Sequence, residues 1–143
     1  MKRIIMMTIM IITAVFVLAG CVDSDGASAS GDNTVVISER FFVNEMLEIV
    51  MNHRQYLGRT LQFEGMFRAI PVDDVDRFIV MRYMDGCCGQ DAIGLEVIIG
   101  DLAPFAHDAW VEVTGTLDLD DGFLVVRVTS ITELEERGSE FVS

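Results

Sequence analysis

The sequence predicts a mainly β domain with one helix at its N-terminal end. A stretch after residue 38 carries apolar residues at helical spacing, and the sequence beyond it alternates apolar and polar residues in short runs separated by turn signals. The chain has 143 residues, which is enough for one domain. We therefore expect a single helix that packs on a small β-structure.

The helix is predicted over residues 39–57. Ser38 is a suitable N-cap, and Glu39 places a carboxylate in the first turn, where the helix dipole favours negative charge. Gly58 follows as a suitable residue after the C-terminal end. The residues at helical spacing that form one stripe are Phe42, Met46, Ile49, Val50, His53 and Leu57.

Five strands are predicted after the helix. The first has Gly65 in its interior, which indicates a bulge or a bend. The residues after Thr132 are acidic, and we expect them to fray. The predicted strands are Thr60–Arg68, Arg77–Met84, Gly94–Ile99, Trp110–Leu117 and Phe123–Ile131.

One helix and five short strands, the first with a central glycine, fit a small five-stranded barrel of the OB type. A closed barrel also hides the strand edges of a small domain. The helix of such a barrel often joins the third and fourth strands, and here that connection is the short segment 101–109. The alternative is an open antiparallel sheet that the helix covers on one face.

The first twenty residues predict a lipoprotein signal peptide. Lys2 and Arg3 precede an apolar run over residues 4–17, which is too short to cross a bilayer as a helix. Residues 18–21, Leu-Ala-Gly-Cys, resemble the bacterial lipobox, in which the cysteine is acylated and becomes the first residue of the mature protein. We expect palmitate or a similar acyl chain on Cys21, which would anchor the protein in the bilayer on the extracytoplasmic face of the cell membrane. The alternative is an uncleaved anchor helix.

The predicted organisation has four parts. Residues 1–20 are the signal peptide, and residues 21–34 are the lipidated cysteine followed by a flexible tether rich in Ser, Gly, Ala and Asp. Residues 35–132 are the OB-like domain, and residues 133–143 are an acidic tail.

The charge of the chain excludes one class of partner. The formal net charge is −13. After residue 20 the chain contains no lysine, and all of its positively charged side chains are arginines. Such an acidic body is repelled by phosphate backbones, which bind clusters of Lys and Arg. We therefore expect no nucleic-acid binding.

Cys87 and Cys88 are the most unusual feature of the predicted domain. They lie between the second and third predicted strands, with a glycine on each side that permits tight backbone geometry. Three interpretations stay open: a vicinal disulfide, thiolate ligands of Zn²⁺ or another soft metal, and two small buried side chains. In the metal interpretation the further ligands are Asp91 and His107, the latter in a loop.

No catalytic motif is present in the sequence. It has no Ser-His-Asp spacing, no HExxH motif, no phosphate-binding loop and no dinucleotide-binding glycine pattern. We therefore expect that the protein is not an enzyme. We expect Arg77 and Arg82, both in the second predicted strand, to pair with acids on neighbouring strands.

A pattern of residues around the cysteines is more specific than the composition. Its centre is Arg-aromatic-Met-x-x-Cys-Cys-x-x-Asp-Ala, and Trp110-Val111-x-Val113-x-Gly115 extends it. The other matching residues are Phe63-Glu64-Gly65, Asp76-Arg77-Phe78, Val80 and Gly94-Leu95-x-Val97. The pattern resembles the C-terminal soluble domain of the YcgQ-type bacterial membrane proteins, an uncharacterised family of permease accessory subunits.

The resemblance implies a similar domain and an integral membrane permease as partner. Members of that family carry transmembrane helices ahead of the domain, where this chain has the lipobox. We therefore expect a membrane-tethered accessory or binding module, with its binding site near Arg82, Cys87, Cys88 and Asp91. The alternative is an extracytoplasmic metal-binding or thiol-redox protein that uses the two cysteines directly.

Overall fold

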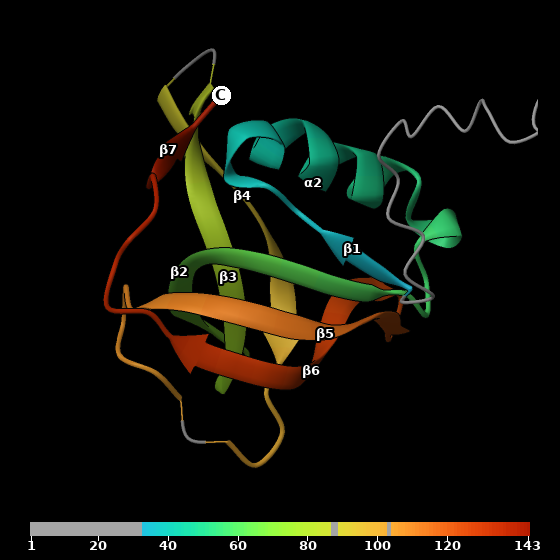
Figure 1. Cartoon of the computed structure of the whole chain (residues 1–143). Coiled ribbons are helices and arrows are strands. Elements are labelled where there is room, and N and C mark those ends of the chain that lie inside the picture. The colour runs from blue at the N-terminus through green and yellow to red at the C-terminus, as the bar shows by residue number, and fades with distance from the viewer. Residues whose placement is uncertain (1–32, 87–88, 103) are drawn as a thin grey trace, which may run out of the picture. The chain divides into compact units, whose positions relative to one another are not determined.

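The computed structural model describes residues 33–143, apart from residues 87, 88 and 103. The predicted signal peptide, Cys21 and most of the predicted tether lie outside the described residues, as do Cys87 and Cys88. The described part is mainly β with one α-helix, as the sequence predicts (Figure 1). Its elements are β1 (Thr34–Val36), the 3₁₀ turn η1 (Glu39–Phe41), α2 (Phe42–Met51), the 3₁₀ turn η2 (His53–Gln55), β2 (Thr60–Val72), β3 (Val75–Gly86), β4 (Gly89–Ile98), β5 (Trp110–Asp120), β6 (Phe123–Glu133) and β7 (Phe141–Val142).

The strands form one seven-stranded sheet in the order β1-β2-β5-β6-β4-β3-β7, with an additional pairing of β2 with β3. Hydrogen-bonded neighbours can therefore be followed from β2 through β5, β6, β4 and β3 back to β2. Within this path the pairing of β4 with β6 is parallel and the other four pairings are antiparallel. The predicted number of five strands is too low, because β1 and β7 add a short parallel strand to β2 and to β3.

β2 changes its partner half-way along its length. Residues 60–66 pair with β5 and residues 66–72 pair with β3, and Figure 1 shows the strand curving between them. Gly65 lies beside this change, and a Cβ atom there would stand 2.8 Å from the carbonyl oxygen of Met81 on β3. The glycine therefore lets the β3 backbone approach β2 closely. A register shift occurs between Thr114 and Gly115 of β5.

The helix is shorter than the sequence predicts. In place of one helix over residues 39–57, α2 has ten residues between two 3₁₀ turns. Ser38 makes no side-chain cap bond; its N–H and hydroxyl instead donate to a carboxylate oxygen of Glu45, over 2.7 and 3.2 Å. The predicted stripe is wrong in its second half: Val50 is exposed although it lies within α2, and Leu57 is exposed beyond the end of α2 at Met51. None of the helices in the described part of the chain has the length and apolar content to cross a membrane.

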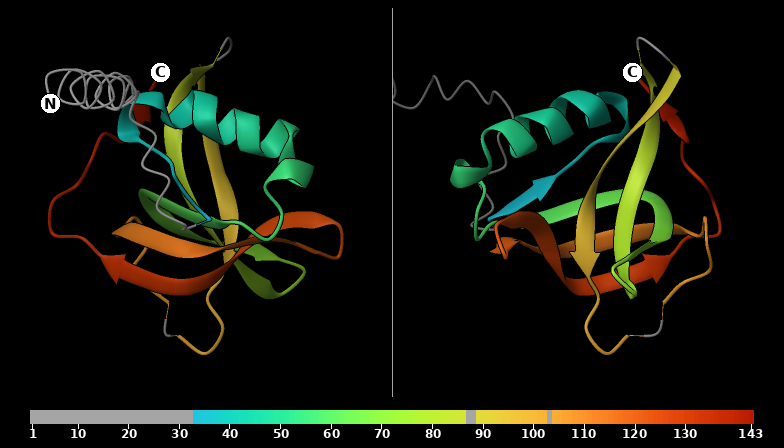
Figure 2. Two further views of the ribbon diagram at one scale, coloured as in Figure 1. Left: turned by 45° about the vertical axis from the view of Figure 1, so that its right-hand side comes forward. Right: turned by 180° about the vertical axis from the view of Figure 1, so that it is seen from behind.

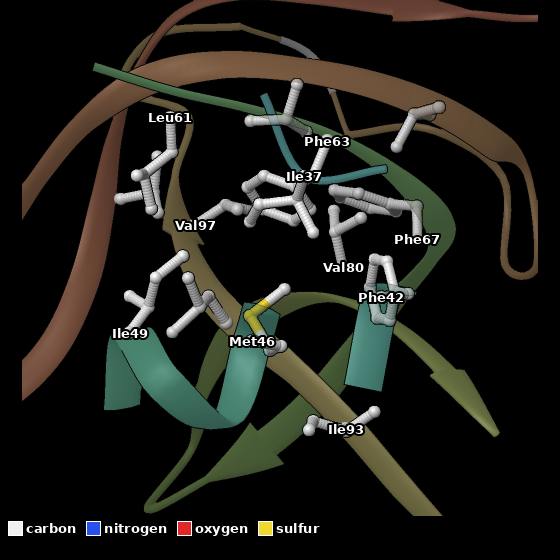
Figure 3. Close-up of a cluster of buried hydrophobic side chains, with 14 of the residues drawn as sticks. Ile37, Phe42, Met46, Ile49, Leu61, Phe63, Phe67, Val80, Ile93 and Val97 are labelled. Carbon is white, nitrogen blue, oxygen red and sulfur yellow. The ribbon is translucent and has the colours of Figure 1, made fainter. Parts of the chain in front are cut away.

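The core lies between α2 and the strands (Figure 2). Phe42, Met46 and Ile49 of α2 point toward apolar side chains of the sheet (Figure 3). Full burial of a side chain of this size stabilises a fold by about 1.5–3 kcal/mol. The facing residues are Leu61, Phe63 and Phe67 of β2, Val80 of β3 and Val97 of β4.

The C-terminal segment does not fray as predicted. Phe141 and Val142 pair with Tyr83 and Met84 of β3, and Val142 belongs to the core. The N–H of Tyr83 also donates to the carbonyl of Glu140 over 2.8 Å. The apolar residues Phe141 and Val142 thus attach an acidic segment to β3. This attachment holds residues 134–140 next to Arg82 of the same strand.

Candidate functional site

Arg82 is the one charged side chain that is buried within the described residues. It comes from β3, it is 2% exposed, and it lies between two aromatic rings. Its guanidinium carbon is 4.7 Å from the ring centre of Phe42 on α2 and 4.8 Å from that of Trp110 on β5. A cation held between two ring faces gains a favourable cation–π interaction, which is largest where water is excluded.

The polar atoms of Arg82 have partners from three other parts of the chain. Nε donates to the backbone carbonyl of Glu64 over 2.9 Å, and Nη1 donates to the backbone carbonyl of Ser139 over 3.2 Å. The carboxylates of Glu39 and Glu64 lie 3.8 and 4.0 Å from the guanidinium nitrogens. A buried charge requires such compensation, since an unpaired one costs several kcal/mol.

The environment of Arg82 acts on its pKa in two directions. Burial lowers the pKa of the guanidinium, and the negative charges of Glu39 and then Glu64 oppose this effect. Because an arginine side chain is not deprotonated in proteins, Arg82 keeps its positive charge. Its donors are directed at fixed carbonyl and carboxylate groups, so its role at this site is to hold other elements in place.

Residues 134–140, which we call the C-terminal strap, run across this cluster. The N–H of Leu134 donates to the carbonyl of Trp110 over 2.8 Å, and the N–H of Ser139 donates to the carboxylate of Glu39 over 2.7 Å. Gly138 packs so closely on the indole that a Cβ atom there would lie 3.0 Å from Cζ2 of Trp110. The strap therefore joins β5, η1 and β3 through a few specific contacts.

A pocket of about 500 Å³ opens beside the strap. Its lining residues are Glu39, Glu64, Leu134, Glu135, Glu136, Arg137, Gly138 and Ser139. A second pocket, of about 80 Å³, shares Glu39 and Glu64 and also contacts Arg82 and Glu112. Neither lining contains a histidine or a cysteine. The carboxylates of the lining can accept hydrogen bonds and bind positive charge, and the Ser139 hydroxyl donates to the carbonyl of Phe141 over 2.5 Å.

The comparison with protein families gives one match over this fold. The sequence pattern of the DUF1980 C-terminal domain matches residues 22–142. The chain belongs to the DUF1980 C-terminal domain family. This membership supports the predicted resemblance to the soluble domain of the YcgQ-type proteins. No curated protein matches the chain.

The structure of this DUF1980 C-terminal domain describes three of the residues that the sequence assigns to its candidate sites: Arg82, Asp91 and His107. Asp91 is exposed on β4, opposite Met84, and no ion pair or hydrogen bond joins it to Arg82. His107 is exposed in the loop before β5, with its Nε2 atom 3.8 Å from the carboxylate of Asp108. Among the residues that the structure describes, no three His, Cys, Asp or Glu side chains come together as metal ligands. Cys87 and Cys88 lie outside those residues.

The predicted pairing of the two β3 arginines with acids on neighbouring strands is confirmed. Arg77 lies 3.2 Å from Glu96 on β4, and Arg82 lies 4.0 Å from Glu64 on β2. The sequence analysis missed Glu39, Trp110 and Ser139 as partners of Arg82. The single tryptophan was the available signal for one of them, whereas Ser139 contributes backbone atoms that leave no trace in the sequence.

Proposed function

We propose that this chain is a lipid-anchored, non-enzymatic binding module on the extracytoplasmic face of the cell membrane. The observation that carries the proposal is the Leu-Ala-Gly-Cys motif at residues 18–21, behind a basic start and a short apolar run. The family match begins at residue 22, directly after the cysteine that would become the first mature residue. The predicted signal peptide therefore lies outside the matched residues, whereas most of the predicted tether lies within them.

We also infer that β2 to β6 form a five-stranded barrel of the OB type. The cyclic path of strand pairings, with its single parallel step between β4 and β6, supports this architecture. The long β2, which pairs with two strands in turn, is the kind of curved strand that closes such a barrel. Small barrels of this type bind ligands on their outer surface and loops, which agrees with a binding role.

The character of the Arg82 cluster supports a role without catalysis. Arg82 is engaged with aromatic rings, carbonyls and carboxylates, and the two pockets beside it share the carboxylates of Glu39 and Glu64. Glu39 and Glu64 face Arg82 and accept hydrogen bonds from the Ser139 N–H and the Trp110 indole, so both carboxylates are engaged in structural contacts. The partner that the family resemblance favours is an integral membrane protein, such as a permease.

The anchor is tested by membrane fractionation of cells that produce the wild-type chain, Cys21→Ala and Cys88→Ser. We expect the wild type and Cys88→Ser in the membrane fraction, because both keep the acylated cysteine. Cys21→Ala should be released from the membrane or remain unprocessed. Normal maturation and unchanged membrane retention of Cys21→Ala would contradict the proposal.

A second candidate function is metal binding or thiol redox chemistry at Cys87 and Cys88. The glycines on either side of the two cysteines in the sequence favour it, since the sulfurs of adjacent cysteines converge only where the backbone can turn tightly. Metal analysis of protein purified without chelators distinguishes the two functions. Stoichiometric zinc that is lost in Cys88→Ser would favour the second function, and a metal-free protein that co-purifies with a multispanning membrane protein would favour the first.

A further inference from the structure

Two hairpin turns of the sheet lie outside the Arg82 cluster and its pockets. Asp73 and Asp74 join β2 to β3, with φ of 49° and 62°, and Asp121 and Gly122 join β5 to β6, with φ of 49° and 87°. Positive φ at both central residues is the geometry of a type I′ turn, which continues the twist of its strands. Both hairpins are therefore tight and regular to their ends.

The two hairpins adjoin each other in space. The guanidinium of Arg77, at the start of β3, lies 5.1 Å from the ring centre of Phe123, at the start of β6. A groove of about 380 Å³ opens between them. It is lined by the first residues of β3, the last residues of β4, and Asp120 from the other hairpin. We call this groove and the two hairpin ends the two-hairpin surface.

Apolar side chains are exposed on the two-hairpin surface. Val75 is 64% exposed and Phe123 is 57% exposed. The register pairs Val72 with Val75 and Ile70 with Arg77, so these side chains share one face of the hairpin. Ile70 and Val72 are exposed as well. A contiguous set of exposed apolar side chains next to a groove is typical of a protein-binding surface.

The charge of the two-hairpin surface is strongly negative. Its two arginines are already engaged, Arg77 with Glu96 and Arg127 with Asp118 and Asp120. Four further acids carry no salt bridge to a described residue; they are Asp73, Asp74, Asp76 and Asp121. An excess of negative charge therefore surrounds the exposed valine and phenylalanine side chains. A partner for this surface needs positive charge beside apolar groups.

We propose that the two-hairpin surface docks a protein segment that carries Lys or Arg beside apolar side chains. A second copy of this chain would bring the same negative charge to the contact, and so would an anionic lipid surface, whereas a cationic segment removes the repulsion among the four acids. Phe123, stacked under Arg77 at the centre, would be the main apolar contact. The inference rests on the proposed function, because it names the surface and the partner chemistry of the binding module.

The test uses the full chain purified from membranes in a neutral detergent, with a fluorescent nine-residue peptide as the probe. The peptide contains four lysines and two phenylalanines separated by glycines; one control peptide lacks the phenylalanines and another has glutamate in place of lysine. Fluorescence anisotropy gives the affinity, with empty micelles as the blank. We expect the Lys/Phe peptide to bind at least about tenfold more tightly than either control, the equivalent of one strong contact.

Variants then locate the binding. Phe123→Ser, Val75→Ser and the double change Asp73→Asn/Asp74→Asn should each weaken binding about fivefold or more. Asparagine tolerates positive φ, so the double variant keeps the turn. Met51→Ser, which changes a 76% exposed residue of α2, and Glu48→Gln, which neutralises an exposed acid of the same helix, should change binding less than about twofold. Circular dichroism confirms that each variant is folded.

Three results would overturn this inference: equal affinity of all three peptides, unchanged affinity in all the hairpin variants, or losses in Met51→Ser and Glu48→Gln as large as those in the hairpin variants. Any of them would show that the peptide responds to net charge or to another surface. The failure of the proposed function is separate from these results, because membrane fractionation of Cys21→Ala tests the anchor without any peptide. Peptide binding in detergent does not depend on acylation.

Discussion

Arg82 connects four parts of the fold that are distant in sequence. Its contacts extend to Phe42 on α2, Glu64 on β2, Trp110 on β5 and Ser139 in the C-terminal strap. Each contact alone is modest, but the cation cannot be solvated where it lies, so all of them are needed together. One residue thus fixes the helix, the sheet and the strap in a single arrangement.

Replacing Arg82 should destabilise the domain more than replacing Arg77. We expect Arg82→Met to lower the free energy of unfolding by about 3 kcal/mol, because the buried carbonyl of Glu64 and the nearby carboxylates lose their cationic partner. Arg77→Met, on the same strand and half-exposed, should cost less than about 1 kcal/mol. Urea unfolding of both variants measures this, and similar losses in the two would contradict the role given to Arg82.

Gly94 is required by the close approach of β3 and β4. A Cβ atom there would lie 2.2 Å from the carbonyl oxygen of Val80. Gly94→Ala should therefore cost about 3 kcal/mol or more, since the backbone must move. Gly100→Ala is the control: its φ is +62° and no atom lies within 4 Å, so it should cost about 1 kcal/mol. Thermal unfolding compares the stability of the two variants. An equal shift in melting temperature would show that β3 and β4 can move apart at Gly94 without cost, which would contradict the requirement for glycine.

Asp118 should titrate at an unusually low pH. The side-chain hydrogen bond from Arg127 lowers the pKa of Asp118, with help from the backbone N–H of Leu119. A carboxylate with a depressed pKa contributes stability above its ordinary pKa, and the contribution is lost as the pH falls through the folded value. Arg127→Gln should raise the pKa of Asp118 in an NMR titration, and Arg77→Gln should leave it unchanged. An unaltered Asp118 pKa in Arg127→Gln would contradict this.

The sequence could predict that the two arginines of β3 contact acids on adjacent strands. It could not predict the contact of Arg82 with a residue that is distant in sequence. Arg77 meets Glu96 because paired strands bring opposite charges together, and alternation of apolar residues is enough to expect such a pair. Arg82 meets Ser139 across 57 positions of sequence through a backbone carbonyl. No periodicity or motif encodes that contact, since it depends on where β7 pairs.

The strands show how far alternation alone predicts an element. All five predicted strands overlap β2 to β6, because one side of each faces the core. Their ends are less predictable: β2 and β3 continue through Pro71 and Asp76 up to a two-residue turn, where the sequence indicates an acidic loop. β1 and β7, of three and two residues, are too short for any pattern to stand out.

The β2–β3 turn offers a test of the hairpin geometry. Asp74 has a φ of 62°, which glycine adopts without strain. We expect Asp74→Gly to stabilise the domain by about 0.5 kcal/mol and Asp74→Asn to have a smaller effect, because asparagine removes the charge but keeps a side chain at positive φ. Equilibrium unfolding compares the two. A loss of stability in Asp74→Gly would mean that the turn is not of type I′.

The predicted helix is confirmed in its first half, where the apolar stripe is buried, and wrong beyond Met51, where the chain is no longer α-helical. Phe42, Met46 and Ile49 follow the spacing of a stripe and are buried. The stripe appeared to continue to Leu57 because apolar residues recur by chance after the helix has ended at Met51. Contact with the sheet, rather than spacing, decides where a helix of this length stops.

The domain as one body is acidic, mainly β and built around a single apolar core. Composition predicts the acidity, and the alternation of apolar and polar residues predicts the strands. The candidate site could be predicted only in part: Arg82 was singled out, while the strap that covers it was expected to fray. The proposals give two parts of the chain distinct roles: residues 18–21 direct attachment to the membrane, and the two-hairpin surface binds a cationic partner.

Mass spectrometry of the mature N-terminus tests the proposed attachment most directly. The protein is purified from the membranes of cells that produce the full chain, and its N-terminal peptide is analysed. We predict a mature chain that begins at Cys21 and carries a diacylglyceryl group with palmitate or a similar acyl chain. A mature chain that still begins at Met1, with an unmodified thiol at Cys21, would contradict the account.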